Sequence, residues 1–147
     1  MADSGYEHAD TPGLAVGYAS EFEEADALDT SVPYAAGGLY STVLDLERWV
    51  DALDADALVD AAAMQRFVTP LADTADGGKT GYAYGVNVGD VDGHRVISHE
   101  GVINGFNSFL AWYPDDGLTI ALLTNRPEGP DLVMTARRAA ALALKNP

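Results

Sequence analysis

Residues 96 to 125, VISHEGVINGFNSFLAWYPDDGLTIALLTN, hold the strongest pattern in the chain. Three apolar runs in this stretch predict three adjacent strands. The last two runs are separated by Pro-Asp-Asp-Gly at residues 114–117, which favours a tight turn between antiparallel strands. Five polar residues interrupt the apolar background: His99, Glu100, Asn104, Asn107 and Ser108. We expect a functional site at this polar group, which ends a core strand beside a glycine-spaced turn.

The pattern extends towards the N-terminus through an Asp-Gly pair at residues 92–93, which favours a two-residue hairpin. The chain therefore predicts a four-stranded antiparallel meander over residues 82–88, 94–100, 106–113 and 118–124. Ahead of it, Ser41 or Thr42 offers an N-cap oxygen, and Asp45 lies in the first helical turn, where the helix dipole favours a carboxylate. The apolar stripe of this helix is Leu46, Trp49, Val50, Leu53 and Ala57.

The remaining elements complete one α+β domain, an antiparallel sheet of about four strands with flanking helices. Apolar spacing predicts a second helix over residues 58–67 and a last helix from Asp131 to about Leu144. A chain of 147 residues is long enough to bury one ordinary core. The predicted organisation is a loop-rich entry at 1–40, helices at 41–67, the meander at 82–125 and a C-terminal helix at 131–145.

The charge balance argues against one class of partner and for one kind of surroundings. The formal net charge is -15, with 23 acidic residues against eight Lys and Arg, so the surface is strongly acidic. Carboxylates in excess with scarce lysine are typical of a halophilic protein, because high salt screens the self-repulsion. Nucleic acid is excluded as a partner, since phosphate contacts need a basic face.

The sequence also predicts no cofactor and no membrane partner. Cysteine is absent, which excludes disulfides and thiolate metal sites. Asp90, Asp92 and His94 resemble a metal cluster, but such groups arise by chance at a hairpin tip in so acidic a chain. No apolar run is long enough to span a bilayer and no leader follows Met1, so we expect a cytoplasmic chain as it stands.

In order and spacing, four segments resemble the C-terminal half of the serine β-lactamase and penicillin-binding-protein superfamily, especially its class C-like branch with esterases and D-amino-acid-releasing peptidases. The segments are 36–46, 84–86, 99–106 and 114–125, and the resemblance covers about residues 14–125. It implies the C-terminal part of the β-lactamase/transpeptidase-like fold. It also implies a small-molecule or peptide substrate for the complete enzyme.

The resemblance assigns roles to the polar group. In the superfamily a Lys-Thr-Gly or His-x-Gly motif lies on the strand that lines the active-site groove. Carried over, His99 faces the nucleophile, Gly101 lets the substrate backbone approach, and the Val102 N–H points at the developing oxyanion. Asn104 and Gly105 follow as candidate substrate-binding residues.

Two other residues or motifs near the predicted site receive no role. Strand alternation points Glu100 away from the groove. Lys79-Thr80-Gly81 spells the Lys-Thr-Gly motif, but we place it in the loop before the meander. His99-Glu100-Gly101 ends a strand and leads into a turn, which is the setting that the motif needs. The alternative for His99 is a hydrogen-bonded strand histidine without a role.

The resemblance also implies motifs that these residues do not contain. No serine has a lysine three residues on, and no tyrosine has an asparagine two residues on. The Ser-x-x-Lys nucleophile and the Tyr-x-Asn motif are therefore absent. We expect a truncated or split reading frame of a serine hydrolase of amides, esters or β-lactams, inactive alone.

The alternative is a noncatalytic binding module, or one that pairs with a separately encoded N-terminal half. Where strands of the family fold are missing, an exposed sheet edge favours self-association.

Overall fold

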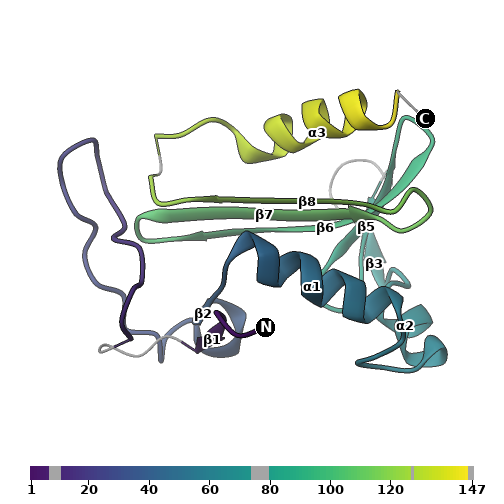
Figure 1. Cartoon of the computed structure of the whole chain (residues 1–147), viewed down its shortest axis with the longest axis horizontal. Helices are drawn as coiled ribbons and strands as arrows, with labels where there is room; N and C mark the ends of the chain where they lie inside the picture. The colour runs from purple at the N-terminus through teal and green to yellow at the C-terminus, as the bar shows by residue number, and fades with distance from the viewer. Residues whose placement is uncertain (7–10, 74–79, 127, 146–147) are drawn as a thin grey trace.

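The computed structural model describes residues 1–6, 11–73, 80–126 and 128–145. Within these ranges a six-stranded antiparallel sheet forms the centre, in the order β3-β4-β5-β6-β7-β8 (Figure 1). Its strands are β3 (Ala72–Asp73), β4 (Thr80–Tyr82), β5 (Asn87–Val91), β6 (His94–Ile103), β7 (Phe106–Tyr113) and β8 (Leu118–Thr124). A separate two-stranded sheet pairs β1 (Gly5–Tyr6) with β2 (Leu39–Tyr40).

The helices lie on both faces of the large sheet. They are α1 (Val43–Asp54), α2 (Ala61–Phe67) and α3 (Leu132–Ala143), with a short 3-10 helix, η1, at Tyr34–Ala36. Figure 1 shows α3 on one side of the sheet and α1 on the other. Side chains cap the two long helices: Thr42 accepts a hydrogen bond from the Asp45 amide, and Asp131 accepts one from the Met134 amide. None of the helices in the described ranges is long and apolar enough to cross a membrane.

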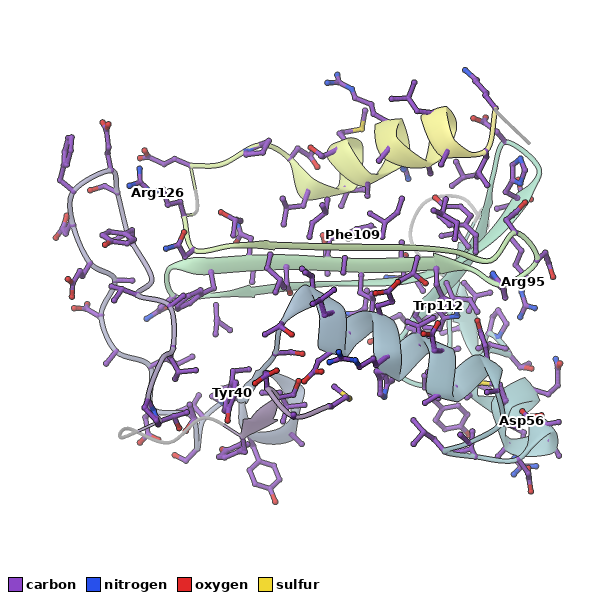
Figure 2. The ribbon with its side chains drawn as sticks, in the orientation of Figure 1. Tyr40, Asp56, Arg95, Phe109, Trp112 and Arg126 are labelled. Carbon is purple, nitrogen blue, oxygen red and sulfur yellow. The ribbon has the colours of Figure 1, made fainter. Side chains whose placement is uncertain are left out.

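Two apolar clusters hold these layers together. The cluster beneath α1 and α2 contains Val50, Leu53, Val68, Ala83, Val86, Ile97 and Trp112. The cluster beneath α3 contains Val96, Phe109, Ala111, Tyr113, Ile120, Ala136 and Ala140. Strand alternation explains the division, because neighbouring residues such as Val96 and Ile97 point to opposite faces. In Figure 2, Phe109 lies on the α3 side of the sheet and Trp112 on the α1 side.

The predicted α+β class is confirmed, with local differences in its boundaries. The second helix begins at Ala61 instead of residue 58, with Asp60 as its N-cap, and Ala57 lies beyond the end of α1. The sheet is wider than the four-stranded meander by the short strands at its β3 end.

One predicted strand is wrong. Residues 82–88 do not form a single strand, because a turn separates β4 from β5. In this turn the Ala83 amide bonds the Val86 carbonyl, and Gly85 has a φ of +78°. Thr80 and Gly81 lie in β4 rather than in a loop, whereas Lys79 is outside the described residues.

Candidate active site

Strand β6 has two halves with different neighbours. Strand β5 pairs with β6 from His94 to Ser98, whereas β7 pairs with it from Ile97 to Ile103. In the described part of the chain, residues 99–103 therefore have a strand partner on the β7 side alone. We call His99–Ile103 the open half of β6.

The two hairpins that flank β6 decide which backbone groups face its open edge. His94 and Val91 flank a two-residue turn, as do Ile103 and Phe106, and such flanking pairs bond each other. Backbone groups alternate in direction along an antiparallel strand. Odd-numbered residues from Ile97 to Ile103 therefore bond β7, and even-numbered residues of β6 face the β5 side. The N–H of Val102 thus points out of the open edge, beyond the end of β5.

The His99 side chain is exposed, and it emerges on the face of the sheet that carries α1. It lies opposite Leu110, which packs against the cluster beneath α1 and α2. The Nε2 atom of His99 lies 3.1 Å from the hydroxyl oxygen of Tyr82, at the end of β4. Glu100 lies opposite Phe109 on the other face, as the predicted alternation requires.

Gly101 has a packing reason to be glycine. A Cβ placed on it would lie 2.5 Å from Oγ of Ser108, its partner on β7. A larger residue would displace that hydroxyl group. The close approach of a substrate backbone at Gly101 stays a prediction.

Asn104 and Gly105 form the turn between β6 and β7 and contact the N-terminal loop. The Asn104 side-chain amide donates to the Asp26 carbonyl at 3.3 Å. Gly105 has a φ of +77°, and a Cβ on it would lie 2.7 Å from Cα of Gly17. Both residues therefore seat this loop on the sheet. Their predicted role in substrate binding stays a prediction.

The same loop is tied to the end of β8. The Tyr18 amide bonds the Asn125 carbonyl at 3.0 Å, and the Asn125 side chain donates to the Val16 carbonyl at 2.8 Å. The Arg126 guanidinium lies 5.3 Å from the centre of the Tyr18 ring. Arg126 marks this end of the sheet, far from α2, in Figure 2. These contacts hold the N-terminal loop in place beyond the β6–β7 turn.

Sequence reasoning missed the role of Asp45, which is fully buried. Its carboxylate accepts hydrogen bonds from the Asp3 amide at 2.8 Å, the Ser4 hydroxyl at 2.8 Å and the Arg48 guanidinium at 2.7 Å. Burial raises the pKa of Asp45, but these hydrogen bonds outweigh it and lower the pKa to about 2. Asp45 thus fastens the start of the chain to α1. The sequence signal for Asp45 was its position three residues after Thr42, but this position predicted only a favourable interaction with the helix dipole.

Two members of the acidic group at the hairpin tip, Asp90 and His94, have hydrogen-bond partners of their own. Nδ1 of His94 lies 2.9 Å from a carboxylate oxygen of Asp116, and Asp90 accepts a hydrogen bond from the Gly93 amide. Among the described residues, no three His, Asp or Glu side chains gather closely enough to hold a metal ion.

Two hollows in the described part of the chain lie away from His99. One, of about 350 Å³, is lined by Tyr6, Tyr34, Ala35 and Leu39. The other, of about 190 Å³, lies where α1 and α2 meet β6, with Arg95 and Ile97 in its wall. The candidate site is therefore an open strand edge and not one of these hollows.

Together these features define a class of chemistry. The imidazole of His99 lies at the start of a strand half whose edge presents a backbone N–H that no strand in the described residues uses. Such a donor is able to bind a carbonyl oxygen as it becomes negative, which is the task of an oxyanion hole in acyl transfer. The model of the Beta-lactamase family matches residues 2–145, so the chain belongs to the β-lactamase family.

Solved structures share this fold. The octameric penicillin-binding protein homologue from Pyrococcus abyssi is 24% identical, with a TM-score of 0.79 over 99% of this chain and 34% of that one. The penicillin-binding protein from Bacillus halodurans is 26% identical, with a TM-score of 0.72 over 92% and 43%. The D-amino acid amidase from Ochrobactrum anthropi SV3, complexed with D-phenylalanine, is 19% identical, with a TM-score of 0.74 over 99% and 49%.

The chain spans between a third and a half of the length of these three proteins. No curated protein matches it significantly.

Proposed function

We propose that this chain supplies the oxyanion strand of a β-lactamase-like serine hydrolase. The observation that carries the proposal is the open half of β6, where the Val102 N–H faces the open edge three residues after the exposed His99. An N–H fixed in a strand costs no reorganisation when negative charge develops on a substrate oxygen. The reaction of the complete site would be acyl transfer from an amide, ester or β-lactam to serine, followed by hydrolysis.

The nucleophile has to come from outside these 147 residues, because they contain no Ser-x-x-Lys. We therefore expect the chain alone to give background rates with nitrocefin and p-nitrophenyl esters. We also propose that its acidic surface suits high salt, so these assays belong in molar KCl. Turnover by the isolated chain that is lost in His99→Ala would contradict this expectation.

The test of the proposal is complementation. Tagged chain is used to recover partners from its own cells, and a polypeptide that carries Ser-x-x-Lys is then mixed with it and assayed. Recovery of such a polypeptide and appearance of turnover support the proposal. A complex without turnover favours a noncatalytic binding module instead.

A pair of variants at one residue tests the backbone donor in the complex. Val102→Pro removes the N–H at the open edge, where no described strand uses it, whereas Val102→Ala keeps it. Loss of one oxyanion donor typically lowers kcat about 100- to 1,000-fold. We expect that loss in Val102→Pro and near-normal turnover in Val102→Ala. Equal activity of the two variants would exclude Val102 as the donor.

A further inference from the structure

The polar partner of His99 comes from a strand that the predicted site left out. Tyr82 ends β4, directly after Thr80 and Gly81, and its hydroxyl lies 3.1 Å from Nε2 of His99. The two ring centres are 6.0 Å apart, and the ring planes are inclined by 58°. We propose that Tyr82 is a positioning residue that holds His99 in one tautomer and one orientation. The functional consequence of this role rests on the proposed oxyanion strand.

The hydrogen bond decides where the imidazole proton resides. A neutral imidazole has one N–H donor and one acceptor nitrogen, and the partner of one nitrogen fixes the state of the other. A phenol is a better donor than acceptor, so the Tyr82 hydroxyl donates to Nε2 of His99. The proton of His99 then resides on Nδ1. A ligand that reaches this second ring nitrogen then meets an N–H rather than a lone pair.

The backbone of Tyr82 is fixed well enough to serve this purpose. It pairs with Ala72 of β3 on one side and with Asn87 of β5 on the other. Its carbonyl also accepts a hydrogen bond from the Leu71 amide at 2.8 Å. Only the two side-chain torsions remain to place the hydroxyl. His99 is thus oriented from a neighbouring part of the sheet and not by its own strand.

The size of the effect is limited because water reaches the contact. Tyr82 is 38% exposed, so water replaces part of what its hydroxyl provides. A hydrogen bond of ordinary net strength changes an equilibrium by about two- to tenfold. We expect the ratio of the two His99 tautomers to change by that factor when the hydroxyl is removed.

The experiment is nitrogen NMR of the histidine rings in the 15N-labelled 147-residue chain. Spectra are recorded in alkaline solution, where an ordinary imidazole is neutral, so that the ring nitrogen shifts report the tautomer. Tyr82→Phe deletes only the hydroxyl group. Tyr84→Phe is the matched control, since this more exposed tyrosine lies two residues away. His94, bonded to Asp116, serves as an internal reference in every sample.

The expected result is a His99 ring that carries its proton mainly on Nδ1 in the wild type and in Tyr84→Phe. In Tyr82→Phe the ratio should move two- to tenfold towards the Nε2–H form. A wild-type ring protonated mainly on Nε2, or an unchanged ratio in Tyr82→Phe, would overturn the positioning role.

This measurement separates the two proposals because it needs no substrate. A tautomer shift together with a complemented enzyme that tolerates both Val102→Pro and His99→Ala would refute the oxyanion strand and leave the positioning role intact. An unchanged tautomer ratio in Tyr82→Phe, together with a kcat loss in Val102→Pro, would refute the positioning role of Tyr82 and support the oxyanion strand.

Discussion

The two halves of β6 belong to one strand but have opposite surroundings. Residues 94–98 all pair with β5, Ile97 and Ser98 pair with β7 as well, and Val96 and Ile97 are buried, with 8% and 1% exposed. In the open half, Val102 is 74% exposed and His99 is exposed as well. The difference arises where β5 begins, at Asn87 opposite Ser98. A single strand thus anchors itself in the core with one half and presents backbone donors with the other.

Hydrogen exchange gives the largest contrast between neighbouring residues. The amides of Gly101 and Ile103 bond β7, whereas the amides of Glu100 and Val102 face the open edge. We expect the first pair to exchange at least about a thousandfold more slowly, because their exchange requires opening of the sheet. Residue-resolved exchange followed by NMR measures this. Equal rates for Gly101 and Val102 would mean that the edge is covered or that the strand frays.

Truncation of side chains tests the two halves for stability. Ile97→Ala removes a side chain that is 1% exposed, and it should lower the free energy of unfolding by about 2–5 kcal/mol. Val102→Ala in the open half should change it by no more than about 0.5 kcal/mol. Urea unfolding in molar KCl measures both. A similar cost at the two positions would remove the distinction between an anchoring half and an open half.

Acid sensitivity reports the buried contact that sequence reasoning missed. The pKa of Asp45 is lowered from 3.8 to about 2, so its ionised form stabilises the fold above about pH 4. This contribution is lost as the pH falls from about 4 towards 2. The urea midpoint of the wild type should therefore drop more between pH 5 and pH 2.5 than that of Asp45→Asn.

Asp115→Asn, in the exposed turn before β8, is the matched control for Asp45→Asn. It should retain the wild-type acid sensitivity. Identical pH dependence in wild type and Asp45→Asn would show that the hydrogen bonds to Asp3 and Ser4 contribute little in solution.

The parts of the fold that the sequence predicted well depend on local signals. Alternating apolar residues and the turns at 92–93 and 114–117 place β6, β7 and β8, because each hairpin is specified within a few residues. The predicted start of the second helix was too early, because Leu58 and Val59 are apolar and yet lie outside the helix, with 54% and 37% of their surfaces exposed. Strands of two or three residues, such as β3 and β4, carry too little pattern to be seen.

The contacts of the candidate site were harder to predict because they join distant residues. His99 and Tyr82 are 17 positions apart, and Asp45 lies 41 positions from Ser4. No periodicity links such pairs. The direction of the Val102 N–H depends on nearby residues instead, because it follows from the two hairpin turns that flank β6.

The described part of the sheet has another open edge at β8, which is one of its two outermost strands. Its seven residues, LTIALLT, include no charge and no proline, the devices that usually prevent edge-to-edge pairing. The net charge of -15 opposes contact between copies at low salt. We therefore propose self-association through β8 that appears as salt screens this repulsion. Light scattering should show the mean mass rising between 0.1 and 2 M KCl, by at most about twofold for a dimer.

A charge at the β8 edge should abolish this rise. Leu123→Lys places the charge on a β8 residue that is 44% exposed, and Leu142→Lys places it on the more exposed surface of α3. We expect the first variant to stay monomeric across the salt range and the second to associate like the wild type. Association that persists in Leu123→Lys would move the contact elsewhere, with the open half of β6 as the next edge to block. Because charged and polar side chains already flank that edge at Glu100 and His99, pairing there should be the weaker of the two.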